Sequence, residues 1–357
     1  MELVHEKLDL GALRMPPAAA QVQKIVDGFK AYQVLRAGFQ TGLFDWLAEH
    51  GPAEKSALGV ALRLRGAHLS AFLQALEDLG LLVHCGNLYD IDKDMRAVLS
   101  SASPWCHAQV LDQLSTPDQG WFNMPTFLSE GWLQPTQSLG RSLALHPYFA
   151  EAQQFAAVWA QRTQALDAQA CRRSGPRLLL CFDGSDGLLA ATLCQRDPDL
   201  QATVVVAPSA LRRTQHVLAE CGMAERCKLQ TGTPLDATVW HRHDEVVLFH
   251  CLYAVRKSVS DALRVAASVL TPGGGLASAH WFCNEACASA PGGLRDLDKA
   301  VLTDSHPLCG IEKFPHRLLD AGLIDAMAQD MQGMYGATKL HFAQRPGGGC
   351  FDGGAPC

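Results

Sequence analysis

The sequence predicts an α/β protein in which a doubly wound, mostly parallel sheet follows a smaller, mainly helical domain. In residues 176–282, short apolar runs alternate with helical segments, which is typical of parallel strands joined by crossover helices. In residues 20–100, apolar side chains recur at helical spacing and precede a short hairpin. The 357 residues, 48% hydrophobic and 18% charged, supply material for two domains and exclude a disordered chain.

The first domain is predicted over residues 20–100. A helical run extends over 25–47 and is stopped by Gly-Pro at 51–52, and a second run, AHLSAFLQALEDLGLL, covers 67–82. The segment VHCGNLYDI then predicts two short strands around the Gly-Asn turn at 86–87. Helices followed by a hairpin are the order of a winged helix.

The third helix of this domain does not carry the basic side chains that DNA binding needs. Its polar residues are His68, Ser70, Gln74, Glu77 and Asp78. The formal net charge of the chain is −6, which supplies no basic field for a phosphate backbone. We therefore expect a docking or dimerisation role and no nucleic-acid partner.

Residues 101–170 are predicted to form a helical connector that is rich in aromatic side chains. These are Trp105, Trp121, Phe122, Phe127, Trp132, Tyr148, Phe149, Phe155 and Trp159. They can line a substrate pocket or cement the connector to the next domain, and the sequence leaves both possibilities open. The domain with the parallel sheet is expected over 171–345, and the Gly- and Cys-rich residues 346–357 are expected to be a disordered tail.

The predicted ligand site lies where the parallel strands end. Ligands of doubly wound sheets bind beyond the carboxyl ends of the strands, near the point where the strand order reverses. The turns in question follow Phe182, Ala207, Gly232 and Tyr253.

At this level the chain resembles the small-molecule O-methyltransferases of the plant and acetylserotonin type. The resemblance is carried by QVLRAGFQTGLFDWLAEHG, LSAFLQALEDLGLL, Tyr89, the DGSDG turn, VLTPGGGLASAHWF and LLDAGL. It implies a class I methyltransferase domain of Rossmann-like fold, which binds S-adenosylmethionine. It also implies that the winged helix forms a homodimer.

The resemblance places the cofactor loop at residues 181–187, where the family motif DVGGGxG corresponds to CFDGSDG. It implies a cofactor site at Asp183, Gly184, Asp186, Gly187 and Gly232. Acids that the family carries are replaced by Cys181, Val206 and Thr233. Each lost acceptor would weaken binding by about 1–3 kcal/mol. Either the acids at 183 and 186 substitute for them, or cofactor binding is weak or absent.

The catalytic histidine of the family corresponds to Tyr253 in the segment HCLYAV. Tyrosine is a poor base at neutral pH, although it can orient a hydroxyl. His250, three residues earlier, is either a candidate for the base or a hydrogen-bonded core histidine. If the strand continues to Leu252, alternation places His250 and Tyr253 on opposite faces. In the region that lies over the substrate in this family, His306 and His316 are further candidates for the base.

Two functions follow from these observations. The first is an S-adenosylmethionine-dependent O-methyltransferase that acts on a hydroxyl of a small aromatic or polycyclic molecule. The alternative is a protein of this fold that has lost methyl transfer and serves as a ligand-binding or partner subunit, or catalyses a non-methylating reaction. Family frequency favours the first, and the missing acids and histidine favour the second.

The cellular setting is inferred from what the sequence lacks. The N-terminus shows no secretory signal and the chain contains no apolar run of about 18 residues, so we expect a cytoplasmic protein without a membrane partner. The 13 cysteines are irregularly spaced and include no C-x-x-C pair. Free thiols and no metal site are therefore expected.

Overall fold

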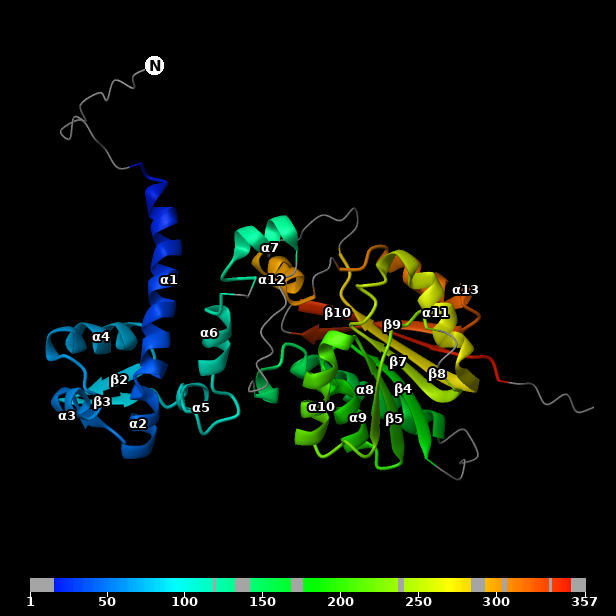
Figure 1. Cartoon of the computed structure of the whole chain (residues 1–357), viewed down its shortest axis with the longest axis horizontal. Helices are drawn as coiled ribbons and strands as arrows, with labels where there is room; N and C mark the ends of the chain where they lie inside the picture. The colour runs from blue at the N-terminus through cyan, green and yellow to red at the C-terminus, as the bar shows by residue number, and fades with distance from the viewer. Residues whose placement is uncertain are drawn as a thin grey trace, which may run out of the picture. The chain divides into compact units, whose positions relative to one another are not determined.

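The computed structural model describes residues 16–117, 120–131, 142–167, 176–236, 241–283, 293–303, 307–333 and 336–347. Contacts within the chain divide it into two compact units, Met1–Gln113 and Leu114–Cys357. Figure 1 shows the helical unit and the unit that contains the large sheet. The division falls inside the segment 101–170 that the sequence assigns to a connector.

The first unit combines short helices with a three-stranded antiparallel sheet of order β1-β3-β2. Its elements are α1 (Ala19–Gln40), α2 (Leu43–His50), β1 (Ala53–Glu54), α3 (Lys55–Ala61), α4 (Gly66–Asp78), β2 (Leu82–Cys85), β3 (Leu88–Ile91), α5 (Arg96–Leu99) and α6 (Ala108–Leu114). The predicted hairpin is present, since β2 pairs with β3 across residues 86–87. This order of elements is compatible with a winged helix.

The single helix expected over 25–47 is wrong. Gly42 adopts φ +73° and separates α1 from α2. This left-handed conformation is inexpensive only for glycine, so Gly42 sets the break. The chain turns there and buries Leu43, Phe44 and Leu47 in the core of the unit.

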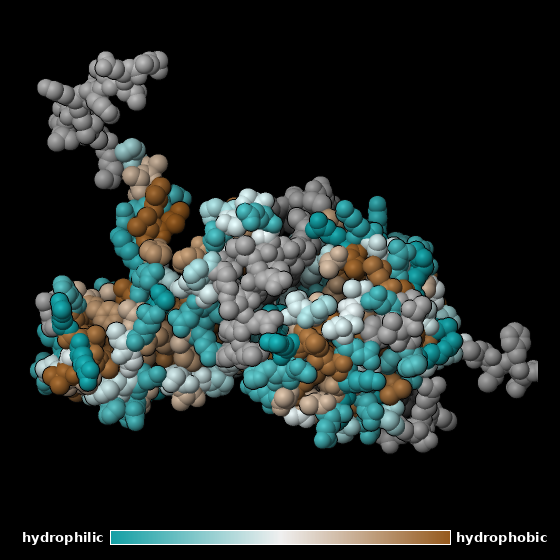
Figure 2. All heavy atoms as spheres, viewed as in Figure 1, coloured by the Kyte–Doolittle hydropathy of each residue, from teal (hydrophilic) through white to brown (hydrophobic). Residues whose placement is uncertain are grey.

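The N-terminal half of α1 exposes a row of apolar side chains. Val22, Ile25, Val26 and Phe29 are exposed by 62%, 74%, 41% and 62%. They are spaced by three or four residues and therefore share one face of the helix. Figure 2 shows this brown surface on α1.

The second unit is built on a seven-stranded sheet of order β6-β5-β4-β7-β8-β10-β9. The strands are β4 (Arg177–Asp183), β5 (Leu200–Val206), β6 (Cys227–Thr231), β7 (His243–Phe249), β8 (Leu270–His280), β9 (Ile324–Gly333) and β10 (Gly336–Gln344). β4 to β8 pair in parallel, whereas β10 is antiparallel to both β8 and β9. The predicted doubly wound, mostly parallel sheet is confirmed.

In the described residues of this unit, two helices precede β4, namely α7 (Met124–Glu130) and α8 (Phe149–Asp167). The helices between the strands are α9 (Leu188–Arg196), α10 (Leu211–Glu220), α11 (Val259–Ser268), α12 (Gly293–Thr303) and α13 (Phe314–Asp320). α9, α10 and α11 are helical segments that lie between apolar strands, as the alternating pattern of residues 176–282 predicts. The apolar run LASAHWF predicts a strand that begins at Leu276 after a TPGGG turn, whereas β8 begins at Leu270 and includes residues 271–275.

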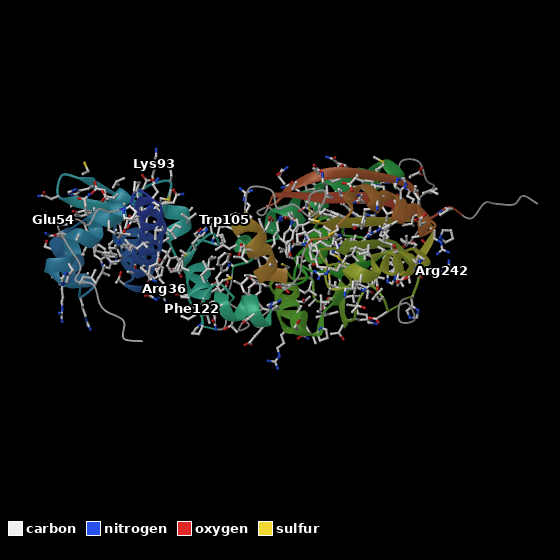
Figure 3. The ribbon with its side chains drawn as sticks, turned by 90° about the horizontal axis from the view of Figure 1, so that it is seen from above. Arg36, Glu54, Lys93, Trp105, Phe122 and Arg242 are labelled. Atoms are coloured by element: carbon white, nitrogen blue, oxygen red, sulfur yellow. The ribbon has the colours of Figure 1, made fainter. Side chains whose placement is uncertain are left out.

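The strand order places the switch point at β4, which lies between β5 and β7. The loops after β4, β5, β6 and β7 therefore converge on the side of the sheet where the parallel strands have their carboxyl ends. Among the aromatic residues of 101–170, Tyr148, Phe155 and Trp159 are buried, whereas Trp105 and Phe122 are exposed (Figure 3). Trp132 lies outside the described residues.

No helix in the described parts of the chain is both long and apolar enough to cross a membrane. Of the predicted tail at 346–357, the structure describes residues 346–347 only.

Candidate functional site

The loop after β4 is held by the carboxylate of Asp183. One oxygen accepts hydrogen bonds from the backbone N–H of Ser185 (2.7 Å) and from its hydroxyl, and the other accepts one from the N–H of Ala190 (3.1 Å). Burial raises the pKa of Asp183, and these hydrogen bonds oppose that shift. Both oxygens of this buried side chain are thus engaged in ordering the start of α9.

The two retained glycines make close approaches within the chain. A Cβ at Gly184 would contact the carbonyl oxygen of His250 and lie 2.9 Å from that of Phe249. Gly187 has φ +84°, and a Cβ there would lie 2.7 Å from Thr214 Cγ2. Glycine is therefore required at both positions for packing, while the backbone of Gly184 stays exposed at the edge of the sheet.

Asp186 differs from Asp183 because its carboxylate is partly accessible and ion-paired. Arg213 of α10 donates to both oxygens at 2.9 Å, and His146 Nε2 lies 3.5 Å from Oδ2. Burial raises the pKa of Asp186, but the hydrogen bond from His146 and the charge of Arg213 outweigh it and lower the pKa below its ordinary value. An ionised acceptor with an 18% exposed side chain therefore lies in this loop.

The three positions where acids were expected have other roles. Cys181 and Val206 are buried in β4 and β5, and burial raises the pKa of the Cys181 thiol well above its ordinary value. Thr233 donates its backbone N–H (2.7 Å) and its hydroxyl (3.1 Å) to Asp236. Gly232 N–H donates to the Val206 carbonyl at 3.1 Å, which joins the ends of β5 and β6.

The loop after β7 contains a pair of residues whose predicted orientation is wrong. His250 Nδ1 and Tyr253 Oη are hydrogen-bonded at 2.7 Å, so the two side chains meet instead of facing opposite sides. Alternation fails because β7 ends at Phe249 and His250 adopts φ +48°. The backbone N–H of Trp281 donates to Tyr253 Oη at 2.8 Å.

A buried carboxylate completes this network. Glu151 Oε2 lies 2.6 Å from His250 Nε2 and accepts a hydrogen bond from the Thr338 hydroxyl at 2.8 Å. Since a tyrosine hydroxyl can donate to Nδ1, the arrangement fits a histidine that carries its proton on Nε2 and donates it to Glu151. The Glu151 and His250 side chains are fully buried.

The Tyr253 hydroxyl is unsuited to the role of a general base. Burial raises its pKa well above the ordinary value, and its oxygen is engaged with His250 and Trp281. A general base needs a pKa near the working pH and access to the substrate proton. The network therefore holds the loop after β7 in place.

Other histidines were weighed in the sequence or missed by it. His306 lies outside the described residues, and His316 is exposed on α13. His280 was not anticipated; its Nε2 accepts the backbone N–H groups of Cys251 (3.2 Å) and Leu252 (3.1 Å). Burial lowers the pKa of His280 well below its ordinary value, so this ring is a neutral acceptor.

Glu151 and Asp236 were also missed. Glu151 shares the buried face of α8 with Ala152 and Phe155, so an acid within an apolar helical face was the available signal. Asp236 follows Thr233 by three residues, a spacing that allows a side-chain turn.

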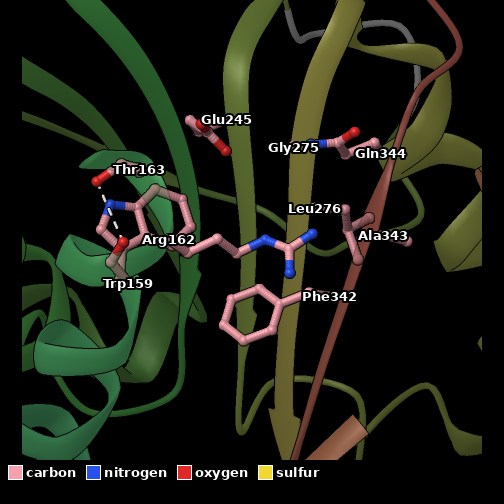
Figure 4. Close-up of a pocket in the computed structure, with 9 residues that line it drawn as sticks. All are labelled: Trp159, Arg162, Thr163, Glu245, Gly275, Leu276, Phe342, Ala343 and Gln344. Carbon is pink, nitrogen blue, oxygen red and sulfur yellow. Dashed lines mark hydrogen bonds between the residues drawn. The ribbon is translucent and has the colours of Figure 1, made fainter. Parts of the chain in front are cut away.

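A hollow elsewhere in the unit is lined by Trp159, Arg162, Thr163, Glu245, Gly275, Leu276, Phe342, Ala343 and Gln344. The Arg162 guanidinium extends across it and lies 4.6 Å from the centre of the Phe342 ring (Figure 4). Among the described residues, no group of three or more His, Cys, Asp or Glu side chains could hold a metal ion.

Comparison with known proteins identifies the fold. No family model matches the sequence, and no similar sequence is found among the curated proteins. An O-methyltransferase family protein from Burkholderia thailandensis matches with TM-score 0.66 and 18% identity over 95% of this chain and 100% of the other. Human N-acetylserotonin methyltransferase, solved with S-adenosylmethionine, gives 0.59 and 20% over 93% and 99%.

A putative O-methyltransferase from Nostoc punctiforme gives a TM-score of 0.62 and 16% identity over 93% of this chain and 100% of the other. These similarities span both units and confirm the fold that the resemblance implies.

Proposed function

We propose that this protein binds S-adenosylmethionine at the carboxyl ends of β4 to β7 and transfers its methyl group to a hydroxyl of a small aromatic or polycyclic molecule. The observation that carries the proposal is the loop after β4, where the exposed backbone of Gly184 lies beside the ionised Asp186. The loop belongs to a sheet with the fold of methyltransferases.

The residues at the carboxyl ends of β4 to β7 fit a nucleoside cofactor, although their hydrogen-bond acceptors differ from those that the family resemblance implies. The cofactor supplies an electrophilic methyl group on a positively charged sulfur. The backbone of Gly184 is exposed, so a ligand can approach it directly. Asp186 offers carboxylate oxygens that can accept hydrogen bonds from ribose hydroxyls, and Asp236 is a second acid at the end of β6.

The proton of the substrate hydroxyl requires an acceptor other than Tyr253. His316, which is exposed on α13, is one candidate on sequence grounds. His306 is a second candidate on sequence grounds. Deprotonation by a positioned histidine typically contributes about 10²–10⁴-fold in rate.

The alternative function is ligand binding, or a reaction other than methyl transfer, on the same fold. Two observations favour it: Val206 is apolar and buried where an acid was expected, and Tyr253 is locked into the core network. Both functions place a ligand at the same edge, so cofactor binding separates them.

The deciding experiment is calorimetric titration with S-adenosylmethionine and S-adenosylhomocysteine. We expect both to bind, with affinity reduced at least tenfold in Asp186→Asn, because a charged acceptor becomes a neutral amide. The matched control is Asp199→Asn, an exposed acid between α9 and β5. A folded parent protein that binds neither compound would support the alternative function.

Methyl transfer is tested separately by measuring S-adenosylhomocysteine formation with a panel of phenols and hydroxylated polycyclic compounds. Product with any member supports the O-methyltransferase, and cofactor binding without product across the panel favours the alternative.

We further propose a cytoplasmic homodimer formed through the first unit. The apolar row on α1, Val22, Ile25, Val26 and Phe29, provides a surface that a second copy could cover. In light scattering we expect twice the chain mass of 38.6 kDa, and a monomer for Ile25→Lys. Val60→Lys, at a residue 82% exposed on α3, is the control that should stay dimeric. A monomeric parent would contradict the proposal.

A further inference from the structure

Two cysteine side chains meet where the chain leaves β8. Phe282 and Leu308 form an isolated parallel bridge, in which Cys283 N–H donates to the Leu308 carbonyl (2.9 Å). Cys283 and Cys309 directly follow this bridged pair. Their Sγ atoms lie 3.2 Å apart, although 26 positions separate the two residues in the sequence.

We propose that Cys283 and Cys309 are a site of reversible oxidation, at which the two thiols form an intrachain disulfide. Neighbouring strands lie about 4.8 Å apart, which is within the range of Cα separations that disulfides span. A disulfide has an S–S length of about 2.05 Å, so the sulfurs need to approach by only about 1 Å.

Access distinguishes this pair from the other close pair of thiols. Cys309 is exposed and Cys283 is half-buried, so a soluble oxidant can reach the site. Cys194 and Cys227 also lie close, with Sγ atoms 3.7 Å apart, but both are buried in the core. Proximity is common to both pairs, whereas access is specific to Cys283 and Cys309.

The reaction is a thiol–disulfide exchange with a small disulfide such as oxidised glutathione. One thiolate attacks the glutathione disulfide, forms a mixed disulfide and releases one glutathione thiolate. The second cysteine thiolate then displaces the other glutathione. Two electrons pass to glutathione, and the two thiol protons end on the two released glutathione molecules.

The bond would join the end of β8 to the segment that leads into α13. α12 lies between the two cysteines in sequence, and its Lys299 ammonium is 5.2 Å from the centre of the Trp281 ring. Trp281 donates to Tyr253, so the crosslink would form two residues from the network after β7. Oxidation should therefore raise the thermal stability of this part of the unit.

The test uses the reduced full-length protein, incubated with millimolar oxidised glutathione, alkylated, digested and analysed by mass spectrometry. We expect a crosslinked peptide that joins Cys283 to Cys309, and a Tm that rises by several degrees and returns after reduction. The exposed Cys85 should carry only a mixed disulfide.

Variants make the result specific. Cys309→Ser should leave Cys283 as a mixed disulfide and abolish the Tm shift, whereas the matched control Cys85→Ser should preserve the crosslink and the shift. The proposal is overturned if either thiol pairs with Cys287 instead, or if both are glutathionylated without a crosslink. It does not depend on the proposed function, because it is read without cofactor or substrate.

Discussion

The loops after β4 and β7 both lie at the carboxyl ends of the parallel strands, but they differ in the exposure of their polar side chains. The loop after β4 keeps the backbone of Gly184 exposed and the carboxylate of Asp186 partly accessible. In the loop after β7, the buried His250 side chain is hydrogen-bonded to Tyr253 on one ring nitrogen and to Glu151 on the other. The difference separates two tasks: one loop can still contact a ligand, whereas the other has become part of the core.

The buried network of Glu151, His250 and Tyr253 also affects the loop after β4. Gly184 N–H donates to the Phe249 carbonyl at 2.7 Å, so the end of β7 supports the loop after β4. Buried polar groups that are hydrogen-bonded to one another hold a single arrangement, because each lost partner leaves a costly unpaired group. The loop after β7 therefore supports the position of the loop after β4.

The largest expected effect comes from removing the carboxyl group of Glu151, which joins α8 to the loop after β7. Glu151→Ala leaves His250 and Thr338 without their acceptor and opens a cavity. We expect the free energy of unfolding to fall by about 3–5 kcal/mol, measured by urea unfolding. Glu225→Ala, at an exposed residue, should change it by less than about 0.5 kcal/mol. Equal effects of the two substitutions would show that the network does not support the fold.

Acid should affect the buried histidines of β8 and β10 and the loop after β4 in different pH ranges. Burial lowers the pKa of His280 well below 6.5, and burial followed by the charge of Lys339 lowers the pKa of His341 to about 4. Because these folded-state pKa values are depressed, the associated stability is present above pH 6.5 and is lost as the pH falls. His341 alone should account for about 3 kcal/mol between pH 6.5 and pH 4.

Asp186 should follow only at lower pH, because its pKa is lowered from 3.8. Stability measured from pH 7 to pH 3 should thus fall first through the histidines. His341 packs against Phe282 and Phe314, and neither ring nitrogen has a hydrogen-bond partner among the described residues. His341→Leu should remove most of its share of the acid loss, and His68→Leu, at an exposed site, should leave the profile unchanged.

A smaller effect is expected from Tyr253→Phe. The substitution removes the acceptor of the Trp281 N–H and the partner of His250 Nδ1, so stability should fall by about 1–3 kcal/mol. Methyl transfer by the folded variant should stay within a few fold of the parent. A loss of activity by several orders of magnitude at unchanged cofactor affinity would instead identify Tyr253 as a catalytic residue.

The smallest effect on the free energy of unfolding is expected from a substitution in the loop after β4. Asp186→Asn weakens a partly exposed ion pair with Arg213, and we expect a cost of at most about 1 kcal/mol at pH 7. The same variant is expected to lose at least tenfold in cofactor affinity. A larger loss of stability than in Tyr253→Phe would reverse the comparison between the two loops.

Regular elements of the fold were predictable because their signals are local. The apolar runs of β4, β5 and β7 and the helical spacing of α9 and α11 mark buried faces within a few residues of sequence. The break at Gly42 was missed because glycine also occurs inside helices. The pairing of β10 between β8 and β9 depends on contacts that no local pattern encodes.

The sequence predicted which loop forms the candidate site, but it did not predict the contacts that the side chains make there. The resemblance located the loop at 181–187, yet the roles of Asp183 and Asp186 depend on whether each carboxylate faces α9 or Arg213. The facing of His250 was mispredicted because alternation applies only while a strand continues. Its partner Glu151 lies 99 positions away, beyond the reach of any spacing argument.

The hydrogen bond from Thr338 to Glu151 joins residues 187 positions apart and has a consequence for folding during synthesis. α8, β4 and β7 leave the ribosome long before β10, which carries Thr338 and is inserted between β8 and β9. Until that last hairpin emerges, the sheet ends at β8 and the buried carboxylate lacks one of its donors. The buried network around Glu151 is therefore completed only after β10 has been translated, and a nascent chain that stops before β10 lacks this hydrogen bond.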